Sequence, residues 1–202
     1  WSYIDIHGNW TSPWIRSTAG LTDVAHKNGV SVGTLMSIPF GNSVYLTSWR
    51  SDVYSRVLFR LTQKRGDKYL YAEPLVRMMK YYGINGIGFN SEFRTSSSVM
   101  TQLSEFFVAC HKEAEKLKWK FEVHWYDGTS DDGQIHVNGG LGYHNQKIFG
   151  DKDNIATDML FANYNWGPNH LSGSVSTANR LGRSSFDYYA GFDIQGRGLR
   201  QP

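Results

Sequence analysis

An amide and a carboxyl side chain, Asn90 and Glu92, stand two residues apart at the end of a short run that begins at Gly86. Successive side chains of a β-strand point to opposite faces, so this pair would share one face with Gly86 and Gly88. A carboxyl group is a common general acid or base in catalysis. A buried amide without partners costs roughly 2–7 kcal/mol, so the pair is either a functional site or the exposed end of a strand.

The elements that would position this pair alternate between strands and helices. Apolar periodicity and stop signals predict strands at 3–7, 30–38, 84–90, 121–126, 158–166 and 188–194. Helices are predicted at 21–28, 51–61, from 73 to a stop at Gly83, at 99–117 after a serine cap, and at 174–181. Such an alternation is typical of a parallel sheet with crossover helices.

Polar and aromatic residues stand near the end of almost every predicted strand: His7, Ser37, Asn90 and Glu92, His124 and Tyr126, Asn165 and Trp166, Asp193 and Gln195. A (β/α)8 TIM-type barrel gathers such strand ends around one site, whereas an open sheet would concentrate them at one crevice. A barrel usually takes about 250 residues and eight strands. We therefore expect an α/β chain, 1–202, that forms one partial catalytic barrel domain with about six of the eight strands, with flanking barrel segments or accessory domains elsewhere.

The composition of the chain indicates which classes of binding partner to expect. The 202 residues are 40% hydrophobic and 15% aromatic, with a net charge of +3. The basic residues are scattered or interleaved with glutamates, which argues against nucleic acid, whereas the seven Trp and twelve Tyr favour a carbohydrate. No apolar run is long enough for a membrane span. The lone Cys110 excludes an internal disulfide, and His136 and His144 lack a third ligand for zinc, so no metal or other cofactor is expected. The compartment stays open: extracellular, cell-surface or periplasmic in a bacterium, or cytoplasmic.

Several segments together resemble glycoside hydrolase family 85, the endo-β-N-acetylglucosaminidases that cut between the two GlcNAc residues of the N-glycan core. The resemblance covers most of the chain, in the family's order and spacing. Its segments run from Tyr81 to Glu92, from His124 to Asp127, from Phe161 to Trp166, and from Tyr189 to Gly198.

The resemblance implies a retaining, substrate-assisted mechanism, in which the sugar's own 2-acetamido oxygen attacks the anomeric carbon. Glu92 would be the acid/base, Asn90 would orient the acetamide, and Tyr126 is similar to the family's tyrosine that hydrogen-bonds the same group. Trp166 resembles the aromatic wall beside the cleaved sugar. Further positions expected to bind the N-linked glycan are Asn163, Asn165, His124, Asp193 and Arg197, although His124 could be a satisfied barrel-core histidine and Arg197 could tie down a turn.

Two alternatives stay open. A family 18-like chitinase would need aspartates where Asn85, Gly88 and Asn90 stand, so only Glu92 matches that pattern. An inactive carbohydrate-binding barrel is the other. This alternative is kept open by one departure from the family pattern. Family 85 members tend to carry a Trp, which serves as a sugar platform, and an amide residue where this loop has Val137 and Asn138. Trp10, Trp14 or Trp49 could replace that platform.

Overall fold

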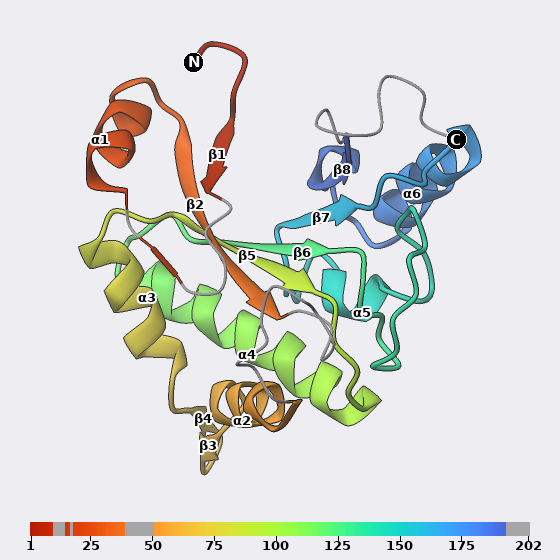
Figure 1. The fold of residues 1–202 in the computed structure, drawn as a ribbon, viewed down its shortest axis with the longest axis horizontal. Coiled ribbons are helices and arrows are strands. Elements are labelled where there is room, and N and C mark those ends of the chain that lie inside the picture. Colours follow the sequence, from red (N-terminus) through yellow and green to blue (C-terminus); the bar gives the residue numbers. More distant parts are fainter. Residues whose placement is uncertain (10–14, 17, 39–50, 193–202) are drawn as a thin grey trace.

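The computed structural model describes residues 1–9, 15–16, 18–38 and 51–192. Its main sheet has six strands, all parallel, and their order in space is their order along the chain (Figure 1). The strands are β1 (Ile6–Asn9), β2 (Ser31–Ile38), β5 (Gly86–Ser91), β6 (Glu122–Tyr126), β7 (Met159–Ala162) and β8 (Tyr188–Ala190). Such a sheet is the larger part of a TIM-type barrel, so the expected fold class is confirmed.

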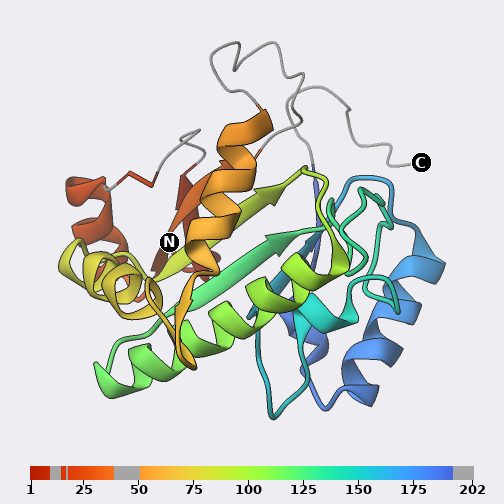
Figure 2. The same cartoon turned by 90° about the horizontal axis from the view of Figure 1, so that it is seen from below.

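Helices connect the strands, as parallel pairing requires. They are α1 (Ala19–Lys27), α2 (Ser51–Leu61), α3 (Ala72–Tyr81), α4 (Ser97–Lys116), the short α5 (Gln146–Phe149) and α6 (Pro168–Arg180). Figure 2 shows α4 running along the sheet between α3 and α5, and these helices are in contact. A short antiparallel hairpin, β3 (Lys64–Arg65) and β4 (Lys68–Tyr69), precedes α3, and a 3-10 turn (Ser185–Asp187) precedes β8.

The core lies between the sheet and α4. Phe89 of β5 packs against Phe107 of α4, with ring centroids 5.0 Å apart, and Trp125 of β6 lies 6.1 Å from the same ring. All three side chains are buried. Because alternate strand residues point to opposite faces, the neighbours of Phe89 and Trp125 must face the concave side of the sheet. Asn90 and Tyr126 are those neighbours.

Local signals placed most boundaries correctly. Ser96 caps α4 by accepting a hydrogen bond from the Val99 N–H, and Gly83 follows α3 with φ +69°, a value that favours glycine. Helix α6 begins at Pro168, before the predicted start at 174, while the β3–β4 hairpin and α5 were not predicted. Cys110 is buried, as expected.

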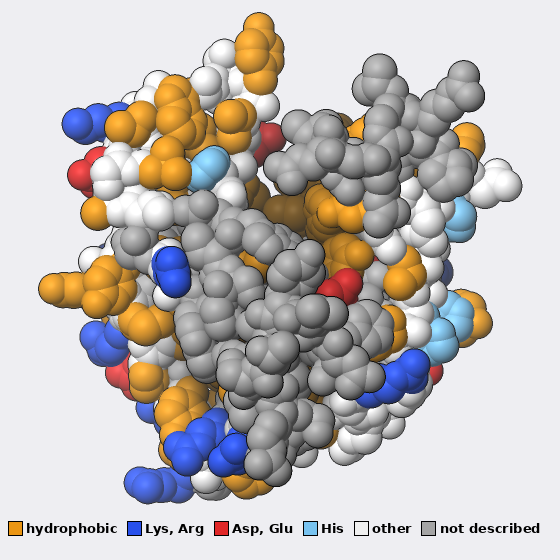
Figure 3. Space-filling view, in the orientation of Figure 1, with side chains coloured by type: hydrophobic (Ala, Val, Ile, Leu, Met, Phe, Trp, Pro, Cys, Tyr) orange, Lys and Arg blue, Asp and Glu red, His pale blue; other side chains and the backbone are white. Residues whose placement is uncertain are grey.

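The sheet does not close on itself within the described residues, since β1 pairs only with β2 and β8 only with β7 there. Figure 3 shows a hollow between the β1–β2 side and the β7–β8 side, with hydrophobic side chains on its walls. This is the concave side of the half-barrel. In the described part of the chain, no helix combines the length and the apolar character that a membrane crossing needs.

Candidate functional site

Asn90 and Glu92 are in direct contact at the carboxyl end of β5. The Asn90 Nδ2 donates a hydrogen bond of 3.1 Å to Glu92 Oε2, and Asn90 is only 8% exposed. Strand β5 ends at Ser91, so Glu92 lies just beyond the strand and is partly buried. The two side chains therefore point into the same space, as the sequence predicted, and the buried amide has a partner.

The strand register places Tyr126 level with Asn90. Gly88 pairs with His124 and Phe89 with Trp125, so the next positions along β5 and β6 are Asn90 and Tyr126. Continuing across the sheet, Tyr126 pairs with Phe161, and their ring centroids are 6.0 Å apart. One layer of the concave face thus holds an amide, a phenol and an aromatic ring, at the barrel end where TIM-barrel sites lie.

The two glycines of β5 make room for neighbouring side chains of the barrel. A Cβ added to Gly86 would lie 2.7 Å from the His124 ring, and one added to Gly88 would lie 3.3 Å from Leu35. His124 also lies 3.3 Å from Glu122 through its Nε2. His124 is thus a packed barrel histidine beside Gly86, below the Asn90 layer, and its binding of substrate stays a prediction.

The segment after β7 lies beside the loop that follows β6. Trp166 Nε1 donates to the Gly191 carbonyl at 2.8 Å, and its ring meets Phe192 edge-on at 5.3 Å. Asn165 donates to the Val137 carbonyl at 3.1 Å, so it ties this segment to the loop, and Asn163 accepts a hydrogen bond from the Tyr164 N–H at 2.6 Å. These contacts fix Trp166 beyond the carboxyl end of β7. Binding of a sugar by these three residues stays a prediction.

Asp127 anchors the loop after β6, a role that was not predicted from the sequence. It is 2% exposed, and its carboxylate accepts hydrogen bonds from the Gly139 N–H (2.6 Å) and from the amides of Asn138 and Asn145 (both 3.2 Å). Burial raises the pKa of Asp127 to about 7, while these donors oppose the rise. Asn138 thus helps to hold the loop itself. Its neighbour Val137 is exposed, with 42% of its surface accessible.

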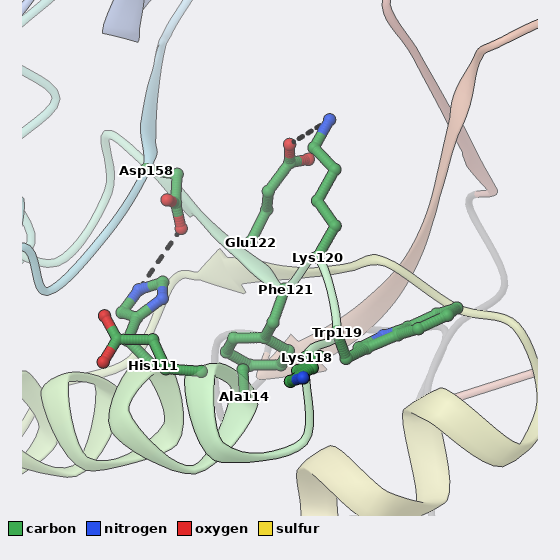
Figure 4. A pocket seen from close by; sticks show the side chains of 9 residues that line it. His111, Ala114, Lys118, Trp119, Lys120, Phe121, Glu122 and Asp158 are labelled. Carbon is green, nitrogen blue, oxygen red and sulfur yellow. Dashed lines mark ion pairs between the residues drawn. The ribbon is translucent and has the colours of Figure 1, made fainter.

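A separate hollow lies at the other end of the strands, lined by His111, Trp119, Phe121, Glu122 and Asp158 among others (Figure 4). It contains two ion pairs, His111 with Asp158 at 3.3 Å and Lys120 with Glu122 at 2.8 Å. Glu122 and Asp158 lie at the amino ends of β6 and β7, the end of a TIM barrel whose residues serve stability. We therefore do not assign chemistry to it.

Two predicted site residues, Asp193 and Arg197, lie outside the described residues, as do Trp10, Trp14 and Trp49. Within the described ranges, no group of three or more His, Cys, Asp or Glu side chains is arranged to hold a metal ion.

Comparison with known proteins gives a consistent match. The model of glycosyl hydrolase family 85 matches residues 1–201. The chain is 28% identical over 205 residues to the cytosolic endo-β-N-acetylglucosaminidase of Gallus gallus, covering 98% of the chain and 25% of that protein. The Homo sapiens protein of the same name is 26% identical over 204 residues, covering 98% and 24%. The chain thus spans about a quarter of the length of these relatives.

A solved structure agrees with this match. The Endo-D glycoside hydrolase domain from Streptococcus pneumoniae R6 superposes with a TM-score of 0.76 at 26% identity, covering 87% of this chain and 27% of that one. The half-barrel and the sequence match therefore point to the same group of proteins.

Proposed function

The chain belongs to glycosyl hydrolase family 85, and from this membership we propose that it carries the catalytic half of an endo-β-N-acetylglucosaminidase acting on N-glycans. The substrate bond would be the GlcNAc-β1,4-GlcNAc linkage of the core. The observation that carries the proposal is the 3.1 Å contact between Asn90 and Glu92 at the carboxyl end of β5.

Glu92 is proposed as the acid/base. In the first step, the 2-acetamido oxygen forms a bond to the anomeric carbon while the glycosidic bond breaks, and Glu92 gives its proton to the leaving oxygen. The product is an oxazolinium ion, the protonated form of the sugar oxazoline, and it keeps its N–H proton so that attack by water restores the acetamide. In the second step, Glu92 takes a proton from water, and the water oxygen replaces the acetamido oxygen at the anomeric carbon. Two inversions give overall retention.

Asn90 is proposed to hold the acetamide. Its Nδ2 donates to Glu92, so its Oδ1 is the atom that can accept the acetamide N–H. A hydrogen bond there turns the acetamide oxygen toward the anomeric carbon and stabilises the positive charge that develops on nitrogen. Tyr126, level with Asn90 on the next strand, is proposed to donate to the same acetamide.

A conventional retaining glycosidase would instead use a second carboxylate as nucleophile. The nearest carboxylate along the Tyr126 strand is Asp127, and both of its oxygens are engaged by the loop donors Asn138, Gly139 and Asn145. Asp127 therefore serves the loop, which supports the substrate-assisted mechanism.

The competing function is a sugar-binding barrel without activity, which the exposed Val137 keeps open. A binding module needs no acid/base, so it gives no reason for the retained pairing of Asn90 with Glu92. The chemistry of this contact therefore favours the enzyme.

A single incubation separates the two. The full-length protein is mixed with a high-mannose glycopeptide, and the products are analysed by mass. We expect release of a glycan that ends in one GlcNAc and a peptide that keeps the other, with no release by Glu92→Gln. Binding of the glycopeptide without release, for every N-glycan class tried, would favour the sugar-binding module.

A further inference from the structure

Glu92 lies beyond the end of β5, and one buried side chain holds the backbone on both sides of it. Thr129, 1% exposed, follows β6 by three residues. Its hydroxyl Oγ1 lies 2.9 Å from the Ser91 carbonyl oxygen, 2.7 Å from the Phe93 carbonyl oxygen and 3.2 Å from the Phe93 nitrogen. Ser91 and Phe93 are the chain neighbours of Glu92, so Thr129 spans the general acid/base.

The hydroxyl is needed in both of its roles. It accepts the Phe93 N–H and gives its single proton to one of the two carbonyls, Ser91 or Phe93. The Ser91 carbonyl also accepts the Thr129 N–H at 2.7 Å. A valine at this position would keep that backbone contact but would leave the Phe93 N–H and C=O without their partner.

On the β2 side, backbone pairing of β5 reaches Ser91, one residue short of Glu92. The Glu92 N–H donates only to the Asn90 carbonyl, at 3.1 Å, among the backbone bonds described here. On the β6 side, the register of β5 with β6 ends at Phe89 and Trp125, before Asn90 and Glu92. Beyond that register, the described ends of the two strands are joined by the hydrogen bonds of Thr129 and by that of Ser91 Oγ.

The same contact reaches the Tyr126 side of the site. Ser91 Oγ donates to the Tyr126 carbonyl at 2.6 Å, and Trp125 Nε1 donates to the Thr129 carbonyl at 3.2 Å. The strand ends also touch directly, because a Cβ on Gly128 would overlap the Ser91 carbonyl oxygen. Moving Thr129 would therefore shift Glu92 relative to Tyr126.

We propose that Thr129 is a positioning residue for catalysis, whose hydroxyl sets the position of Glu92 against Asn90 and Tyr126. This inference rests on the proposed function. Since an error of about 1 Å in a catalytic group can cost about 100-fold in rate, loss of the hydroxyl should act on the chemical step rather than on substrate binding.

The test compares Thr129→Val with Thr129→Ser in the full-length protein, using steady-state hydrolysis of a high-mannose glycopeptide. We expect Thr129→Val to lower kcat by about 10- to 100-fold with KM within about twofold of wild type. Thr129→Ser keeps the hydroxyl and should stay within about threefold of the wild-type kcat. The matched control is Thr157→Val, because Thr157 is fully buried and its hydroxyl has no hydrogen-bond partner; its kcat should not change.

Thr129→Cys keeps the test decisive if the valine protein does not fold, because it differs from the serine protein only in replacing the hydroxyl with a weakly bonding thiol. The inference is supported if Thr129→Cys has a kcat as low as that expected for Thr129→Val while Thr129→Ser stays near the wild-type kcat. Wild-type kcat in Thr129→Val, or equal values for the cysteine and serine proteins, would overturn it while the proposed function stands. If the wild-type protein releases no glycan, which is the result expected for Glu92→Gln, both this inference and the proposed function are overturned.

Discussion

Replacing Asn90 and Glu92 in turn should separate the two halves of the proposed reaction. In Asn90→Ala, the acetamide loses the group that orients it, and Glu92 loses the 3.1 Å hydrogen bond from Nδ2. Hydrolysis of an intact glycan should fall because the oxazoline no longer forms efficiently. Glu92 is still present as a base, so the second half of the reaction should survive.

The expected size follows from the lost contacts. A hydrogen bond to a charged group contributes roughly 1.5–3 kcal/mol, and each 1.36 kcal/mol in a barrier is tenfold in rate, so this bond alone corresponds to about 10- to 150-fold. Misplacing the internal nucleophile adds a further factor of about 100. We expect kcat/KM of Asn90→Ala to be lower by about 10³- to 10⁴-fold.

Two donors make the assay specific. With a glycopeptide, both Asn90→Ala and Glu92→Gln should release almost no glycan. With a preformed sugar oxazoline and a GlcNAc acceptor, Asn90→Ala should form the coupled product and not hydrolyse it rapidly, whereas Glu92→Gln should show only the slow background. The control is Asn28→Ala, because Asn28 is exposed at the end of α1 and bonds only locally. An Asn90→Ala protein that hydrolyses glycans normally, or a fully active Glu92→Gln protein, would refute the mechanism.

Three further outcomes are expected. Gly86→Ala should lower Tm by roughly 3–10 °C in thermal unfolding, because its Cβ would lie 2.7 Å from the packed, partly buried His124 ring and overpacking costs about 1–3 kcal/mol. Gly173→Ala, with no atom within 4 Å, should leave Tm unchanged or higher, and equal effects would contradict the packing argument. Since burial raises the pKa of Asp127 to about 7, its protonated form stabilises the fold at low pH, and this contribution is lost as pH rises from about 4 to about 7. Denaturant titrations should therefore show the free energy of unfolding falling over that range relative to Asp127→Asn; a rise would mean that the loop donors outweigh burial. Finally, residues 1–202 alone should aggregate rather than form an active monomer, because within the described residues β1 and β8 are open edges of the sheet; a monodisperse, cooperatively melting, active preparation would show otherwise.

The alternation of strands and helices could be predicted because its signals are local. The Ser96 cap and the stop at Gly83 each act within one turn of a helix, and the apolar spacing of residues 99–117 repeats along α4. The start of α6 was harder to predict, because Leu171 is the only large apolar residue in its first two turns. The β3–β4 hairpin has two exposed residues on its first strand, so it lacks the apolar alternation that identifies strands.

The Asn90–Glu92 pair could be predicted for a similar reason, since the two-residue period of a strand determines which side chains share a face. The period does not say what fills the space on that face. Gly86 and Gly88 share that face, and the side chains nearest to a Cβ placed at these positions are His124 and Leu35, which come from the two neighbouring strands. These contacts depend on the register between neighbouring strands, which the alternation of residues within one strand does not determine.

Thr129 shows the limit of local reasoning most clearly. Its hydroxyl bonds to Ser91 and Phe93, which are 38 and 36 residues away, and the atoms that it bonds there belong to the backbone. A backbone amide or carbonyl has no residue type, so nothing at positions 91 and 93 could have indicated a threonine partner. The need could still have been stated in advance: a strand that ends one residue before the proposed acid/base leaves backbone groups that must be hydrogen-bonded when they are buried. A short polar side chain on the adjacent strand end can meet that need, and Thr129 is the residue that does so here.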